Sequence, residues 1–136
     1  MPFQTLQAVA LRLQPQQDLR LELERYIHQH QLEAACIVTC VGSLTQATIR
    51  LANQPTGTVY QGRFEIVSLT GMLSVHGSHY HIAFADQTGQ TLGGHLLTGS
   101  LIYTTAELVI GLLPQSRFRR EPDPTTGFKE LLIEDR

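Results

Sequence analysis

The sequence has little charge of either sign and no long apolar run. Asp, Glu, Lys and Arg make up 16% of its 136 residues and the formal net charge is −2, a balance that favours a soluble globular protein and gives no support to nucleic-acid binding. No apolar stretch is long enough to cross a bilayer, and the first residues lack the basic and apolar regions of a secretory signal. We therefore expect a cytoplasmic protein without a membrane partner, folded as one domain over residues 1–136.

Cysteine is also scarce, which excludes a disulfide framework. Cys36 and Cys40 are the only two cysteines, and in an extended strand they would lie about 13 Å apart, too far for a disulfide. We interpret both as small buried hydrophobic residues rather than as metal ligands or nucleophiles.

Hydrophobic periodicity predicts one strand, then a helix, then a series of strands. Residues 5–13 alternate like a strand, and residues 18–31 repeat apolar side chains at helical spacing. Strand-like runs follow at 34–42, 44–52, 58–75, 78–86, 90–99 and 100–113. Because their links are short and turn-like, antiparallel pairing is favoured, so the predicted fold class is α+β with an antiparallel sheet. The Pro-rich residues 121–127 predict a loosely packed tail from about residue 121.

Four of the six histidines fall between residues 76 and 95. Side chains alternate along a strand, so His79 and His81 share one polar face of the run 78–86 while Tyr80 belongs to the core face. His95 in the next run likewise shares a face with small residues. His76 has the parity of the core face and is the less suitable ligand.

The hairpin between these two runs decides whether the histidine faces coincide. Residues 86–90 suit a three-residue loop in which Gly89 adopts a left-handed conformation. In that register His81 faces His95 and His79 lies on the diagonal. A two-residue loop would instead bring Tyr80 opposite His95.

Three converging imidazoles are typical of a zinc site with an open fourth position. The sequence therefore predicts His79, His81 and His95 as metal ligands, with zinc as the cofactor. The alternative is that the three are exposed polar residues on the solvent face of the sheet.

Two carboxylates inside apolar runs, Glu65 and Glu107, are the candidate catalytic residues. Either could act as a general base beside the metal, or as a buried structural partner of an arginine, which is the commoner role. The single basic cluster is Arg117, Arg119 and Arg120, which could meet nucleic-acid phosphate. Nearby acidic residues favour intramolecular ion pairs instead.

Several segments together resemble one family: VGSL at 41–44, FEIVSLTGMLS at 64–74, SHYHIAFAD at 78–86, GGHLLTGSLIYTTAELVI at 93–110 and FRREPDPTTG at 118–127. They are similar to the PPC domain, the "plants and prokaryotes conserved" domain. The resemblance implies an antiparallel sheet with flanking helices, a homotrimer and, in some prokaryotic members, a metal held by the H-x-H and GGH histidines. These histidines correspond to His79, His81 and His95.

The resemblance leaves three functions open. The first is a trimeric metal-binding domain that binds a protein or small-molecule ligand. The second is a DNA-binding or transcription-associated protein, because plant members carry AT-hooks before this domain; the present sequence has no such R-G-R-P element. The third is a zinc-dependent hydrolase or lyase. The residues favour binding over catalysis and identify no substrate.

Overall fold

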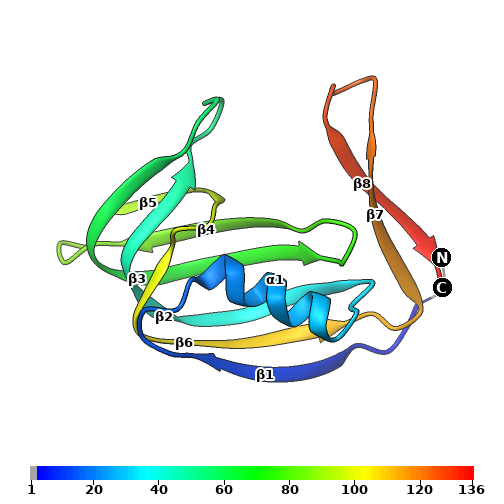
Figure 1. The fold of residues 1–136 in the computed structure, drawn as a ribbon, viewed down its shortest axis with the longest axis horizontal. Coiled ribbons are helices and arrows are strands. Elements are labelled where there is room, and N and C mark those ends of the chain that lie inside the picture. Colours follow the sequence, from blue (N-terminus) through cyan, green and yellow to red (C-terminus); the bar gives the residue numbers. More distant parts are fainter. Residues whose placement is uncertain (1–2) are drawn as a thin grey trace.

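A six-stranded antiparallel sheet forms the body of the protein, whose computed structural model describes residues 3–136 (Figure 1). Its strands, in spatial order, are β1 (Gln7–Leu13), β6 (Leu101–Leu112), β2 (Ala35–Arg50), β3 (Thr58–Leu73), β4 (His79–Ala85) and β5 (Thr91–Leu96). The predicted antiparallel sheet is thus confirmed. Residues 34–42 and 44–52, expected as two strands, belong mostly to the single strand β2.

The end of β2 folds back on the sheet and pairs with β5. Ile49 lies opposite Leu96, and Arg50 lies opposite His95. The register between β2 and β3 shifts between Leu44 and Gln46, and such irregularities bend strands. The bend lets β2, β3, β4 and β5 close into a ring, so Arg50 reaches the strand that carries His95.

One helix, α1 (Leu19–Gln29), packs against the sheet (Figure 1). Its N-cap Asp18 accepts a hydrogen bond from the backbone N–H of Leu21 at 3.0 Å, which satisfies a donor that the first helical turn leaves free. Leu19, Leu23 and Ile27, spaced four residues apart, are fully buried. The family resemblance implied several flanking helices, but α1 is the only helix in residues 3–136. No helix in that range is long and apolar enough to span a bilayer.

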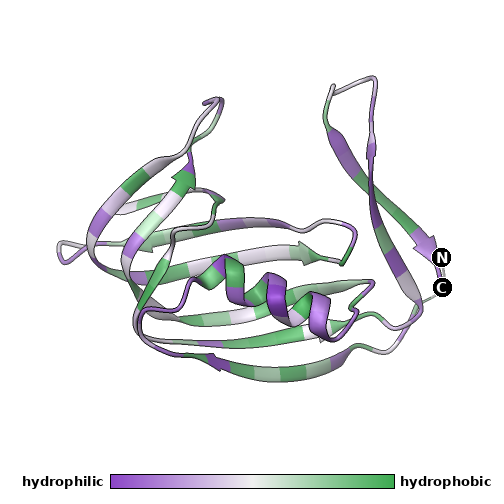
Figure 2. Ribbon diagram, viewed as in Figure 1, coloured by the Kyte–Doolittle hydropathy of each residue, from purple (hydrophilic) through white to green (hydrophobic). Residues whose placement is uncertain are grey.

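The core lies between α1 and the concave side of the sheet. Hydrophobic and hydrophilic residues alternate along the strands (Figure 2), as expected when one face is buried. On β4 the buried side chains are Tyr80, Ile82 and Phe84, which leaves the histidine face free for other contacts. The opposite side of the sheet carries exposed valines at Val38, Val41 and Val67.

The last residues form a separate hairpin of β7 (Ser116–Pro122) and β8 (Lys129–Asp135) that projects from the body (Figure 1). The base of the hairpin is held to the body by Phe118, whose side chain is 3% exposed. The backbone N–H of Phe118 also donates to the carbonyl of Glu33 at 2.9 Å. Residues from 121 onward, expected as a loosely packed tail, form the tip of this hairpin and the strand β8, which pairs with β7 as far as Ser116 at the base. Most of their side chains are exposed.

Candidate metal centre

The β4–β5 hairpin has the register that the three-residue loop predicts. His81 lies opposite His95, Ala83 opposite Gly93, and Phe84 opposite Leu92. The backbone N–H of Asp86 donates to the Gln90 carbonyl at 2.9 Å, which closes the loop. Gly89 has a φ of 84°, the left-handed conformation that glycine adopts at little cost.

The two glycines before His95 let β5 fit tightly between two strands. A Cβ atom on Gly93 would lie 2.8 Å from the Ile82 carbonyl oxygen of β4, and one on Gly94 would lie 2.6 Å from the Arg50 carbonyl oxygen of β2. Real Cβ atoms do not approach this closely, so side chains at either position would push the strands apart. The glycines of the GGH motif therefore hold His95 close to the other two histidines.

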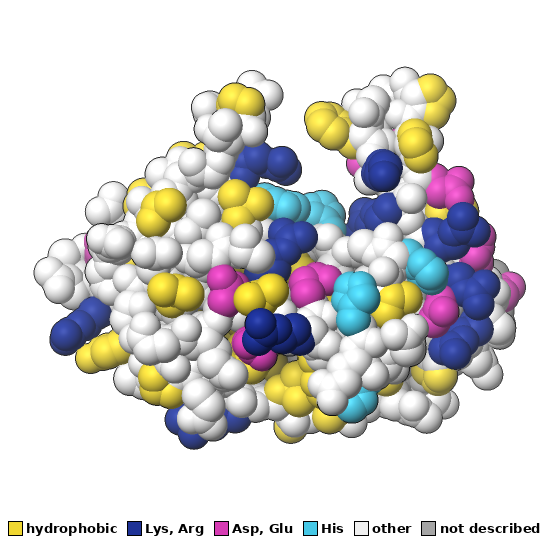
Figure 3. All heavy atoms as spheres, in the orientation of Figure 1, with side chains coloured by type: hydrophobic (Ala, Val, Ile, Leu, Met, Phe, Trp, Pro, Cys, Tyr) yellow, Lys and Arg dark blue, Asp and Glu magenta, His cyan; other side chains and the backbone are white. Residues whose placement is uncertain are grey.

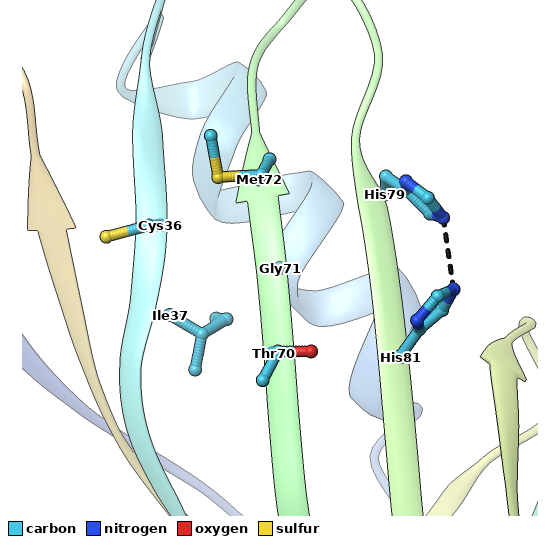
Figure 4. Close-up of a pocket in the computed structure, with 7 residues that line it drawn as sticks. All are labelled: Cys36, Ile37, Thr70, Gly71, Met72, His79 and His81. Atoms are coloured by element: carbon cyan, nitrogen blue, oxygen red, sulfur yellow. Dashed lines mark hydrogen bonds between the residues drawn. The ribbon is translucent and has the colours of Figure 1, made fainter. Parts of the chain in front are cut away.

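The three imidazoles converge, as the register requires. The Nε2 atoms of His79 and His81 are 3.2 Å apart, and Figure 4 shows the two rings with these nitrogens facing each other. The His95 ring centroid lies 5.3 Å from that of His79 and 6.1 Å from that of His81, and one nitrogen from each ring falls within 4.8 Å of the others. Two nitrogen ligands of a tetrahedral zinc are about 3.3 Å apart, so the spacing of His79 and His81 suits this metal.

His95 is held in a neutral state. Burial, followed by the nearby charges of Arg20 and Arg50, lowers the pKa of His95 to about 4. Burial and His81 also lower the pKa of His79. Both rings are therefore unprotonated near pH 7, the form in which imidazole can bind a metal.

One nitrogen of His95 has no partner. Its Nδ1 is buried without a hydrogen bond among the described residues, and a buried polar atom without a partner is costly unless something binds it. The other nitrogen, Nε2, lies 3.4 Å from the Arg20 guanidinium. The three imidazole donors and the unpartnered Nδ1 of His95 are therefore compatible with a bound metal cation.

Arg20 is positioned from α1 by two contacts. Its guanidinium donates to the Leu96 carbonyl and lies 5.3 Å from the Tyr80 ring centroid. The Tyr80 hydroxyl in turn donates to Glu24 at 2.9 Å, and burial raises the pKa of Tyr80. The helix thus supports His95 through residues in its first two turns.

The histidines open onto two hollows. The first, of about 330 Å³, is lined by the seven residues drawn in Figure 4, which include Cys36, Thr70 and Met72 beside His79 and His81. The second, of about 610 Å³, lies between the histidines and the β7–β8 hairpin, and its lining includes Arg50, His95, Arg120 and Lys129. Figure 3 shows histidine and basic side chains within the hollow between two projecting hairpins.

The candidate catalytic carboxylates are not placed with the histidines. Both Glu65 and Glu107 are exposed, so the expectation that they are buried within apolar runs is wrong: each faces outward on its strand. Glu65 lies opposite Ala85, and Ala85 is four positions, about 13 Å, along β4 from His81. Glu107 lies on β6, where its carboxylate accepts a hydrogen bond from Thr105 at 3.2 Å.

The remaining candidates have structural contacts. His76 contacts Glu33 at 3.0 Å and lies outside the three-histidine group. Glu33 also contacts Arg117 at 2.7 Å, and Arg119 contacts Glu121 and Glu134. Ion pairing is thus confirmed for two of the three clustered arginines, whereas Arg120 lines the hollow.

The two cysteines have different surroundings. Cys40 is buried, and burial, with Glu107 nearby, raises its pKa to about 12, so its thiol is unreactive at neutral pH. Cys36 is only half-buried and lines the smaller hollow. The expectation of buried small hydrophobes is confirmed for Cys40 only.

Residues 2–114 match the family described as the Plants and Prokaryotes Conserved (PCC) domain. The chain belongs to the PCC family. This is the family that the sequence motifs resemble under the abbreviation PPC. The PCC chain is 50% identical over 134 residues to the bifunctional protein GlmU of Synechococcus sp. (strain JA-2-3B'a(2-13)), covering 98% of the chain and 21% of that protein. It therefore spans about a fifth of the length of this relative.

Two solved structures share this fold over most of the chain. A protein from Salmonella cholerae-suis superimposes with a TM-score of 0.97 at 43% identity, covering 99% of this chain and 98% of the other. The metal-containing protein AF0104 from Archaeoglobus fulgidus superimposes with a TM-score of 0.81 at 25% identity, covering 93% of each chain.

Most residues around the histidines could not be predicted from the sequence. Arg20, Arg50 and Lys129 come from α1, β2 and β8, and no spacing in the sequence links them to the histidines. The register pair Arg50 and His95 depends on the closure of β2 onto β5, a contact between strands that are not neighbours in the chain.

Proposed function

We propose that this PCC domain is a homotrimeric zinc-binding protein that binds a ligand or partner at its histidine site. The zinc ligands in this proposal are His79, His81 and His95. The observation that carries it is the convergence of one nitrogen from each ring within 4.8 Å. The orphaned Nδ1 of His95 and the description of AF0104 as metal-containing support it.

Each neighbouring residue has a part in this site. Zinc, when bound, would supply a Lewis-acidic position open to one further donor. Arg20 holds the His95 side of the site through its contacts with His95 and the Leu96 carbonyl. The Gly93–Gly94 pair keeps β5 close to β4 and β2. The proposal assigns neither Glu65 nor Glu107 as a general base, because neither lines the two hollows beside the histidines.

The trimer part of the proposal is supported by the uncovered side of the sheet. Val38, Val41 and Val67 are more than half exposed, and exposed apolar residues gathered on one side favour a protein interface. The family resemblance implies three copies. A trimer in solution would have three times the 15.2 kDa mass of the chain.

Metal analysis tests the site directly. Wild-type protein purified without chelator should hold one zinc per chain by plasma mass spectrometry, and His79→Ala and His95→Ala should each lose most of it. His28→Ala, which changes an exposed histidine of α1, is the matched control and should keep the metal. Wild-type protein that takes up no zinc when supplied with the ion would overturn the proposal.

A further inference from the structure

Cations without carboxylate partners gather on the larger hollow. Arg50, Arg120 and Lys129 all line it, and none of them forms an ion pair within residues 3–136. Other arginines of the chain do have glutamate partners: Arg25, Arg117 and Arg119. Arg12, Arg20, Arg63 and Arg136 also form no ion pair within residues 3–136, but none of them lines this hollow. Three unpaired cations are thus brought together in one hollow, although the chain as a whole has a net charge of −2.

These cations approach the hollow from two sides. Arg50 stands at the end of β2, directly opposite His95. Arg120 and Lys129 come from the two strands of the projecting hairpin, β7 and β8. Glu130 is the one carboxylate in the lining, so the positive groups outnumber the negative one.

Concave positive sites suit small anions. A hollow with walls of one charge sign focuses the field and attracts an opposite charge more strongly than a flat surface does. The guanidinium groups of arginine bind phosphate or carboxylate oxygens through two parallel hydrogen bonds. Two arginines on opposite walls can therefore bind one anionic group from both sides.

We propose that this hollow binds a small anion carrying a phosphate or carboxylate group, between Arg50 on one wall and Arg120 with Lys129 on the other. The proposal rests on the proposed function in one respect: it names the ligand class of the same site, because His79 and His95 line the same hollow. The anion would then lie beside the proposed zinc ligands, and zinc, when bound, would offer its open position to an oxygen donor.

The shape of the site favours a small anion over nucleic acid. Binding to a duplex depends on several phosphate contacts spread along a surface, whereas these three cations line a single hollow of about 610 Å³. The remaining arginines of the hairpin are paired with glutamates, so they extend no basic surface away from the hollow.

Calorimetric titration of the full chain tests the proposal, with inorganic phosphate and sodium acetate as separate probes at low ionic strength. Each probe is titrated into zinc-loaded and into chelator-treated protein. We expect one phosphate or acetate per chain, and the tighter probe identifies which group the site prefers. Arg50→Gln and Arg120→Gln should each weaken binding about 10-fold or more, the scale of one lost charge-assisted contact.

Two controls separate the anion site from the metal site. Arg63→Gln removes a cation that lies over the Tyr103 ring, outside the hollow, and should bind both probes like wild type. Zinc content is measured for every variant, and Arg50→Gln and Arg120→Gln should keep it, because neither is a proposed ligand.

The outcomes distinguish the two proposals. Zinc uptake with no binding of either probe, or with equal binding by wild type and both arginine variants, overturns the anion site alone. Probe binding that depends on Arg50 and Arg120 in protein that takes up no zinc supports the anion site and overturns the zinc proposal. A DNA duplex that displaces phosphate in an arginine-dependent manner and binds more tightly overturns the assignment to a small anion.

Discussion

His81 and His95 lie directly opposite each other on β4 and β5, and this pairing depends on a loop at the far end of the hairpin. Gly89, with a φ of 84°, and the carboxylate of Asp86, which accepts hydrogen bonds from Thr88 and Gln90, give the loop its length. The position of the proposed ligands is thus set by residues that do not touch them.

Replacing the loop glycine should lower stability without removing the site. No atom lies within 4 Å of the position that a Cβ on Gly89 would take, so Gly89→Ala meets only the cost of a left-handed backbone, about 1–2 kcal/mol. We expect the melting temperature to fall by about 3–7 °C, with zinc content unchanged. Gln87→Ala, an exposed change in the same loop, should leave the melting temperature unaltered, and a Gly89→Ala melting temperature equal to wild type would contradict the loop assignment.

Metal-free protein should lose stability in mild acid. Burial lowers the pKa of His95 to about 4, so His95 in the folded protein stays unprotonated in mild acid. In the unfolded chain the same side chain takes up a proton below about pH 6.5. The contribution of neutral His95 to the free energy of unfolding is therefore complete above pH 6.5, and it is lost as the pH falls from 6.5 toward 4. Urea unfolding of chelator-treated protein measures this trend.

A glutamine variant provides the control for that pH trend. His95→Gln cannot titrate, so its unfolding free energy should fall less steeply between pH 6.5 and 4 than that of wild type. Parallel pH profiles for the two proteins would show that His95 is not the group responsible.

A charge on the uncovered side of the sheet should break the proposed trimer. Val41 is 62% exposed, so Val41→Glu costs little in the monomer, but three buried carboxylates at an interface would be strongly unfavourable. Light scattering coupled to size exclusion should show the mass falling from three chains to one. Leu21→Glu, on the exposed side of α1, should remain trimeric; a wild-type mass of one chain would overturn the trimer.

Removing the acidic anchor of the β7–β8 hairpin should expose that hairpin to protease. Glu33 accepts from Arg117 at 2.7 Å and contacts His76 at 3.0 Å, and Arg117 first, then His76, lowers the pKa of Glu33. In Glu33→Gln the charged attraction is lost, so trypsin should cut at Arg119, Arg120 and Lys129 several-fold faster.

The matched change for this test is Glu22→Gln, which removes a surface pair with Arg25 within α1. It should leave cleavage of the hairpin at the wild-type rate. Equal cleavage of the hairpin in Glu33→Gln and wild type would mean that Phe118 and the backbone hydrogen bonds hold it without help from Glu33.

Much of the site followed from local rules of the chain. Alternation placed His79 and His81 away from Tyr80, and the turn chemistry of residues 86–90 set the register that brings His95 to them. These features are predictable because strand periodicity and loop length act between neighbours in the sequence. The burial of α1 through Leu19, Leu23 and Ile27 depends on the same kind of local spacing.

Only the tertiary structure brought the other charges to the site. Arg50 lies opposite His95 because β2 bends and closes onto β5. Arg120 and Lys129 line the same hollow as His95 because the base of the terminal hairpin is held at Phe118. The tertiary structure also leaves Glu65 and Glu107 exposed, whereas their apolar neighbours in the sequence suggested burial. Such outcomes depend on which distant surfaces pack together, so the sequence by itself determined the histidine triad, while the packing of distant segments decided the charged hollow around it.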